Sequence, residues 1–198
     1  HQGPGVIATP KDLCQQCHDG LVPADLPTGR QHAPFASGDC LGCHSPHAAS
    51  GKALLPAGRP DAVCTTCHDL ASLYPDARTA HTPVREGRCD ACHDPHGSPQ
   101  PALLRQPPGR LCFTCHVDLQ AEQRRLHVHA PFAQGRCGEC HDAHGTAQAA
   151  GLVAPPRELC GKCHQLDSPA LVAKHRGFPL AAADVAPATR LMPPRRLA

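Results

Sequence analysis

Aliphatic pairs recur at the ends of three polar linkers: Leu54-Leu55, Leu103-Leu104 and Leu152-Val153. The segments that contain these pairs follow one another every 48 to 50 residues. Each segment reads H-x-P-x-x-x-G-x-C-x-x-C-H-x-x-H, then a linker, then a second C-x-x-C-H. This pattern predicts repeats at about residues 32–80, 81–128 and 129–178, after a partial unit at about 11–31. No apolar run reaches about 18 residues, so no membrane span is expected.

The composition does not support an ordinary hydrophobic core. The 198 residues include no Trp, one Tyr, four Phe and one Met, but 23 Pro and 17 Gly. Such a chain buries too little side-chain surface to offset the entropy lost when its backbone is ordered. It also contains 14 Cys and 16 His, far above ordinary usage, so we expect these residues to staple the fold.

Every cysteine falls in the pattern C-x-x-C-H, which occurs seven times. This is the attachment signature of c-type haem: two thiols bond to the porphyrin, and the next histidine ligates the iron. Zinc sites use such units in pairs or with two later histidines, and a disulfide framework needs no histidine there, so we favour haem. The predicted haem-bonding residues are Cys14, Cys17, Cys40, Cys43, Cys64, Cys67, Cys89, Cys92, Cys112, Cys115, Cys137, Cys140, Cys160 and Cys163. The predicted proximal iron ligands are His18, His44, His68, His93, His116, His141 and His164.

Seven haems (haem c) would leave about 28 residues of chain for each haem. We therefore expect the haems to be the core and the polypeptide to wrap them. The predicted fold is a mostly irregular chain with short α-helices, one helical turn at each C-x-x-C-H and loops elsewhere. Residues 1–178 form the predicted haem domain, and residues 179–198 form a Pro- and Ala-rich tail.

Over about residues 11–178, these motifs resemble those of the multihaem cytochromes with doubled CXXCH motifs, a family of respiratory electron carriers. The resemblance implies an exported electron carrier, periplasmic or extracellular. It also implies closely packed haems that are each held by two histidines. The partners to expect are redox proteins or extracellular electron acceptors.

Seven of the nine histidines outside the motifs supply one second axial ligand for each of the seven haems. Three precede a first cysteine by eight residues, and we name them the upstream histidines: His32, His81 and His129. Three follow a proximal histidine by three residues, and we name them the downstream histidines: His47, His96 and His144. The seventh is His175, and His1 and His127 are the surplus.

The length of the intervening chain limits which haem each histidine can reach. Three residues span at most about 10 Å, so a downstream histidine cannot reach the opposite face of its own haem. We expect the downstream set to serve the neighbouring haems at Cys14, Cys64 and Cys112. The upstream histidines lie twelve residues before their local proximal histidine, and we expect them to serve the local haems. His175 then remains for the haem at Cys160.

A shifted assignment also fits the sequence, with each downstream histidine ligating the next haem along the chain. It leaves the haem at Cys14 to His1 or to His175 of a neighbouring subunit. Met192 is a further alternative ligand, and it would raise the reduction potential.

The formal charge of +2 changes when haem is counted. Propionates and iron together bring it to about −5 in the oxidised and about −12 in the reduced protein. Arginines near the motifs are suited to pairing with propionates, although solubility explains them equally well. Basic residues are scattered and aromatic residues are scarce, so we expect no nucleic-acid partner.

The predicted function is electron transfer along seven low-potential haems. A multihaem reductase of nitrite or hydroxylamine, or a gas or redox sensor, needs an iron with an open position. Because no C-x-x-C-H is altered and histidines suffice for every iron, we do not expect an enzyme. The tail Pro179–Ala198 should be flexible unless the haem core or another subunit holds it. With the compact repeat, this tail motivates the hypothesis of a protomer in a conducting filament.

Overall fold

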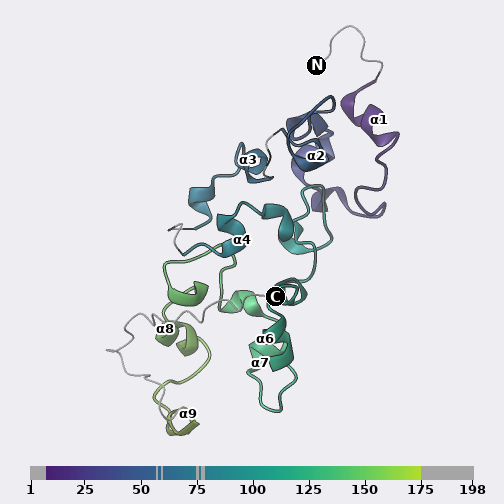
Figure 1. Cartoon of the computed structure of the whole chain (residues 1–198). Coiled ribbons are helices and arrows are strands. Elements are labelled where there is room, and N and C mark those ends of the chain that lie inside the picture. Colours follow the sequence, from purple (N-terminus) through teal and green to yellow (C-terminus); the bar gives the residue numbers. More distant parts are fainter. Residues whose placement is uncertain (1–7, 57, 59, 75, 77–78, 175–198) are drawn as a thin grey trace, which may run out of the picture. The chain divides into compact units, whose positions relative to one another are not determined.

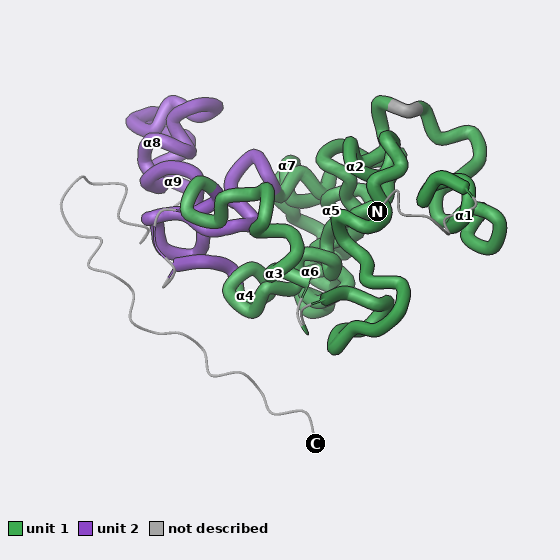
Figure 2. The backbone as a smooth tube through the Cα atoms, turned by 90° about the horizontal axis from the view of Figure 1, so that it is seen from above, with its two compact units in different colours: residues 1–72, 82–137 green, residues 73–81, 138–198 purple. Residues whose placement is uncertain are grey.

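The computed structural model describes residues 8–56, 58, 60–74, 76 and 79–174. His1, His175, Met192 and the predicted tail Pro179–Ala198 lie outside these described residues. The chain divides into two compact units (Figure 2). Unit 1 comprises residues 1–72 and 82–137, and unit 2 comprises residues 73–81 and 138–198.

Short helices joined by loops make up the described chain (Figure 1). The α-helices of unit 1 are α1 (Pro10–Gln15), α2 (Ala33–Ser37), α3 (Pro60–Cys64), α4 (Thr82–Arg85), α5 (Pro108–Phe113), α6 (Val117–Glu122) and α7 (Ala130–Ala133). Those of unit 2 are α8 (Pro156–Gly161) and α9 (Pro169–Lys174). Single 3-10 turns lie at Thr28–Arg30, Cys40–Gly42, Lys52–Leu54, Leu70–Ser72, Cys89–Ala91, Pro101–Leu103, Cys137–Glu139 and Ala149–Gly151.

The predicted fold class is confirmed. No α-helix in the described ranges exceeds six residues, and β-pairing there is limited to isolated bridges. No described helix is long and apolar enough to cross a membrane.

Proline explains where many of these helices begin. α1, α3, α5 and α8 each start at a proline four residues before a first cysteine. Proline fits the first turn of a helix because its missing N–H would have no helical partner there. The upstream His32 and His129 are the N-cap residues of α2 and α7, and a proline follows each within two residues. The motif H-x-P is therefore a helix start.

The glycine of the repeat ends the same helices. Gly38 lies at the C-cap of α2 with a φ of 79°, in the left-handed region. Gly87 and Gly135, at the same repeat position, have φ values of 69° and 68°. A residue with a side chain adopts this conformation only at a cost, which explains why the motif contains glycine.

Few side chains are buried. Among the described residues, the buried hydrophobic ones are Leu26, Ala80 and Phe113, and no side chain there is fully enclosed. In unit 1, the ring of Phe113 meets that of Phe132 edge-on, with 6.3 Å between centroids. These contacts fall far short of a core for a chain of this size.

Isolated bridges link segments that are distant in the sequence. In unit 1, Gln31 pairs with Gly97, and in unit 2, Ala80 pairs with Gly145. Both glycines directly follow a downstream histidine, and both partners directly precede an upstream histidine. Each bridge therefore joins an upstream histidine to a downstream histidine of the following repeat.

Candidate haem-binding sites

Each C-x-x-C-H folds into one closed helical turn where its backbone bonds are described. The histidine N–H donates to the carbonyl of the first cysteine at 3.0 Å, for His18, His44, His68, His93, His116 and His164. Residues three and four positions apart lie on one face of a helical turn. The turn therefore presents both thiols and the imidazole on the same side, as covalent attachment of one haem requires.

A backbone carbonyl orients the proximal imidazole in three of these motifs. Nδ1 of His44 lies 2.8 Å from the Ala53 carbonyl, and the same contact measures 2.8 Å for His93 with Ala102 and 2.9 Å for His141 with Ala150. Because a carbonyl only accepts, Nδ1 must carry the proton. Nε2 is then unprotonated and available to a metal, and its basicity is increased.

The residues that supply these carbonyls are in an unusual conformation. Ala53, Ala102 and Ala150 have φ values of 53°, 52° and 58°, in the left-handed region. This conformation costs an alanine about 1 kcal/mol. The loop is held against the motif by backbone bonds, such as the one from Arg105 N–H to the Cys92 carbonyl at 2.9 Å. Strain of this kind is typical of functional sites.

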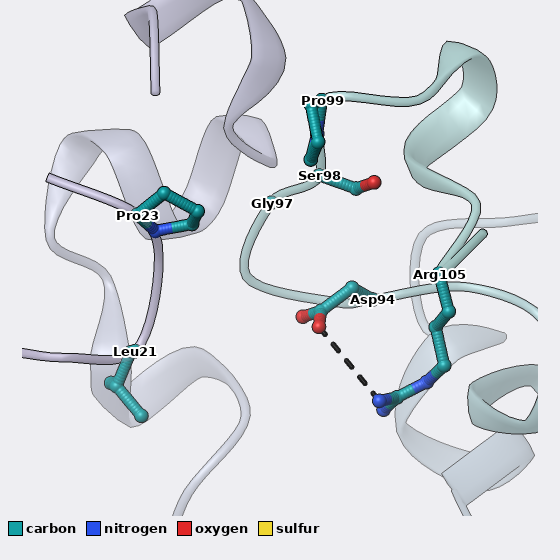
Figure 3. Close-up of a pocket in the computed structure, with 7 residues that line it drawn as sticks. All are labelled: Leu21, Pro23, Asp94, Gly97, Ser98, Pro99 and Arg105. Atoms are coloured by element: carbon teal, nitrogen blue, oxygen red, sulfur yellow. Dashed lines mark ion pairs between the residues drawn. The ribbon is translucent and has the colours of Figure 1, made fainter. Parts of the chain in front are cut away.

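The aspartate that follows the proximal histidine contacts the downstream histidine in two repeats. The Asp94 carboxylate accepts the backbone N–H of His96 at 3.1 Å and lies 3.9 Å from its Nδ1. Asp142 does the same for His144, at 2.9 Å and 3.7 Å. The Arg105 guanidinium lies 3.9 Å from the other oxygen of Asp94. Figure 3 draws this ion pair.

A side-chain hydroxyl two residues after each of these downstream histidines closes the loop that follows the histidine. The buried Ser98 donates its hydroxyl to the Leu104 carbonyl and accepts the Gln100 N–H at 3.0 Å. In unit 2, Thr146 donates to the Leu152 carbonyl at 2.8 Å and accepts the Gln148 N–H at 3.0 Å. In two of the aliphatic pairs, the backbone carbonyl of one residue, Leu104 or Leu152, thus accepts the hydrogen bond that fixes the loop.

The imidazole of His96 is partly buried. The Phe35 ring packs on it with 5.2 Å between centroids and 57° between planes. Burial lowers the pKa of His96, Asp94 acts in the opposite direction, and the neighbouring charges of His44, Arg105 and His32 lower it further. A lowered pKa favours the neutral imidazole, which is the form that ligates a metal.

Two pairs of imidazoles lie close together within unit 1. His44 and His96 have centroids 6.1 Å apart and planes 20° apart. His32 and His68 have centroids 6.0 Å apart and planes 21° apart. The length of the intervening chain predicted His32 with His44 and His96 with His68, so the ring positions do not follow that assignment. The shifted assignment, which placed His96 with the haem at Cys112, does not describe them either.

These separations fit a haem between the rings. With an iron–nitrogen bond of roughly 2 Å on each side and about 1.1 Å from nitrogen to ring centroid, two axial imidazoles have centroids about 6.2 Å apart. In the described part of the chain, no group of three or more His, Cys, Asp or Glu could hold a metal ion. A haem iron takes four ligands from the porphyrin, so two imidazoles from the protein suffice.

Cysteines of consecutive motifs lie next to each other in unit 1. Burial and, after it, the charge and the side-chain hydrogen bond of the Cys89 thiol together raise the pKa of Cys64 to about 11. The pKa of Cys112 is raised to about 11 in the same way, by burial and then by Cys137. The pKa of Cys40 is raised by burial and then by Cys14.

The packing of helices and the second cysteines of the motifs also place consecutive C-x-x-C-H motifs next to each other. α1 packs on the turn Cys40–Gly42, and α3 packs on the turn Cys89–Ala91. Burial raises the pKa of Cys43, and the charges of Asp39 and Cys67 add to the shift. Burial also raises the pKa of Cys92, and the charge of Cys115 adds to that shift. In unit 1, the motifs from Cys14 to Cys115 and the first cysteine of the next motif, Cys137, therefore follow one another in space in their sequence order.

Several of these features escaped the sequence reasoning. The carbonyls of Ala53, Ala102 and Ala150 carry no residue-type signal, because any residue supplies a carbonyl. Asp94 and Asp142 directly follow a proximal histidine, and that repeated position was the available clue. All the predicted iron ligands remain predictions, and His175 lies outside the described residues.

Comparison with known families gives one match. The sequence profile of the family described as "Doubled CXXCH motif" matches the chain three times, at residues 32–72, 81–121 and 129–168. The matches cover more than half of the chain, and together they contain six of the seven C-x-x-C-H motifs. Among curated proteins, the comparison finds no match.

Proposed function

Because the chain belongs to the doubled CXXCH motif family, and is thus a multihaem c-type cytochrome, we propose that it transfers electrons along seven covalently bound haems. The motifs indicate covalent haem attachment. The number seven rests on the sequence, where a seventh motif at Cys14 precedes the three matches. Its turn is closed by the same bond from His18 N–H to the Cys14 carbonyl, at 3.0 Å.

The observation that carries the proposal is the adjacency of consecutive motifs. Bound haem supplies a one-electron carrier, and transfer between carriers is fast only when they are close. In unit 1, the thiols of Cys14 and Cys40, of Cys64 and Cys89, and of Cys112 and Cys137 are neighbours. The chain thereby holds successive attachment points together, and the route for electrons follows the sequence.

We propose an electron carrier without catalytic activity of its own. Each of the seven motifs supplies a proximal histidine, and seven further histidines are in register to close the opposite faces. The carbonyls of Ala53, Ala102 and Ala150 hold the proximal rings with Nε2 available, which favours stable ligation by histidine. No open iron is then left for a substrate.

We further propose an exported protein that works in the periplasm or outside the cell, in respiratory electron transport. The basis for this location is the family of respiratory carriers that the motifs resemble. Assembly with identical subunits into a conducting filament is a finer hypothesis. It rests on the compact repeat and on the tail Pro179–Ala198, which lies outside the described residues.

Haem stoichiometry and internal electron transfer test the proposal together. Intact-protein mass should exceed that of the polypeptide by seven haems. After a flash delivers one electron per protein, that electron should spread over several haems before any second encounter. The Cys89→Ala/Cys92→Ala variant should contain six haems and equilibrate more slowly, because the central carrier is missing. A mass that shows fewer haems refutes the count, and an electron that stays on one haem refutes the function.

A further inference from the structure

We propose that His32 and His96 form a ligand bridge between two neighbouring haems. In this bridge, His96 ligates the haem bound to Cys40 and Cys43, opposite His44. His32 ligates the haem bound to Cys64 and Cys67, opposite His68. The inference rests on the proposed function, since it presupposes bound haem, and it names the sixth ligand at two of the sites.

The positions of the ring nitrogens support the His44–His96 pair. Nδ1 of His44 is bound by the Ala53 carbonyl at 2.8 Å, and Nδ1 of His96 lies 3.9 Å from the Asp94 carboxylate. Both Nδ1 edges thus have local partners, which leaves Nε2 of each ring for a metal. The ring centroids are 6.1 Å apart and the ring planes 20° apart, which is compatible with two axial ligands of one iron.

The two bridging histidines are fixed to each other through their backbones. His32 N–H donates to the His96 carbonyl at 2.9 Å, and Ser98 N–H donates to the Arg30 carbonyl at 3.1 Å. The isolated β-bridge between Gln31 and Gly97 lies between these two hydrogen bonds. A Cβ on Gly97 would lie 3.1 Å from the Gln31 Cα, closer than nearly all real contacts, so this approach favours glycine.

A local loop does not explain this arrangement. His96 follows His44 by 52 residues in the sequence, and His68 follows His32 by 36. Each of the two haems would take its proximal ligand from its own motif and its distal ligand from the bridge. One backbone contact between repeats therefore sets the distal side of both haems. An offset ring stack without metal has similar centroid distances, and the experiment below separates the two cases.

Carbon monoxide binding to the reduced holoprotein tests the bridge. The His96→Ala variant should bind CO at one haem in seven, whereas His127→Ala, which removes an exposed histidine outside the ligand set, should bind none. In a Cys40→Ala/Cys43→Ala background, where the proposed haem is absent, His96→Ala should open no further iron. In a Cys64→Ala/Cys67→Ala background, it should still open one of the six remaining haems.

The opposite outcomes overturn the proposal. If His96→Ala opens no iron in the otherwise unmodified protein, His96 is not a ligand. If it is silent only in the Cys64→Ala/Cys67→Ala background, it ligates the haem that the intervening chain length predicted. A crystal structure of the unmodified holoprotein, phased at the iron edge, decides the question where a variant fails to fold. It must show His96 on the haem of Cys40. Seven closed haems in the unmodified protein would leave the proposed function intact even when the bridge is refuted.

Discussion

Without covalently attached haem, the chain is expected to be unfolded. Among the described residues, only Leu26, Ala80 and Phe113 are buried hydrophobic residues, and the described α-helices have six residues or fewer. Isolated helices shorter than about 12 residues are marginal in water, so packing must supply the stability, and the side chains supply little. A variant with all fourteen cysteines changed to alanine should show a coil-like far-UV circular dichroism spectrum and no cooperative thermal transition.

The holoprotein is the matched control for this expectation. It should keep its helical signal and melt in a cooperative transition that is accompanied by loss of axial ligation. Hydrogen exchange should show protected amides at the closed turns of the C-x-x-C-H motifs in the holoprotein, such as His44 and His93. A cooperative melt of the cysteine-free chain would show that the polypeptide has a core of its own.

Proline at position 102 should disrupt the haem site at His93, whereas glycine there should be tolerated. Ala102 has a φ of 52°, and proline is restricted to about −65°, so Ala102→Pro cannot keep the carbonyl on His93 Nδ1. We expect a loss of roughly 3 kcal/mol or more of stability and a partly opened iron at Cys89–Cys92. Thermal unfolding and CO binding of the reduced variant measure the two effects.

Ala102→Gly is the matched control because it keeps the carbonyl and removes the strain. Its stability should rise by up to about 1 kcal/mol, since glycine adopts the left-handed conformation without the steric cost that alanine has. Its spectrum should equal that of the unmodified protein. Equal stability and equal CO inertness of the proline and glycine variants would mean that the carbonyl does not position His93.

The local parts of the structure follow from sequence patterns. The spacing C-x-x-C-H predicts a helical turn, and that turn is closed by the same bond at His18, His44, His68, His93, His116 and His164. Pro10, Pro60, Pro108 and Pro156 begin helices, as proline does. These features depend on neighbours within a few residues, and for that reason a single sequence reveals them.

The non-local parts do not follow from those patterns. The length of the chain between His32 and His44, or between His44 and His47, limits which haem each histidine can reach, but it cannot show a contact between repeats. The β-bridge between Gln31 and Gly97 brings His32 and His96 together. The sequence indicates this contact only by the glycine that follows the downstream histidine. Gly145 repeats that feature with a φ of 135°, where a Cβ would lie 2.7 Å from the Ala80 Cα.

The strained alanines show a second limit. Ala53, Ala102 and Ala150 adopt positive φ values that a sequence reading assigns to glycine or asparagine. Backbone bonds from the motif to the following loop impose this conformation, for example from Asp94 N–H to the Leu103 carbonyl at 2.8 Å. Tertiary contacts thus override the preference of the residue, and only a structure shows where.

The central claim, that closed haem irons carry electrons along this chain, is tested most directly by a carbon monoxide difference spectrum of the fully reduced holoprotein. The account predicts no spectral change, because it assigns a histidine to the sixth position of each of seven irons. A change equal to one haem in seven or more would contradict it, since an iron with an open or labile position is suited to catalysis or sensing.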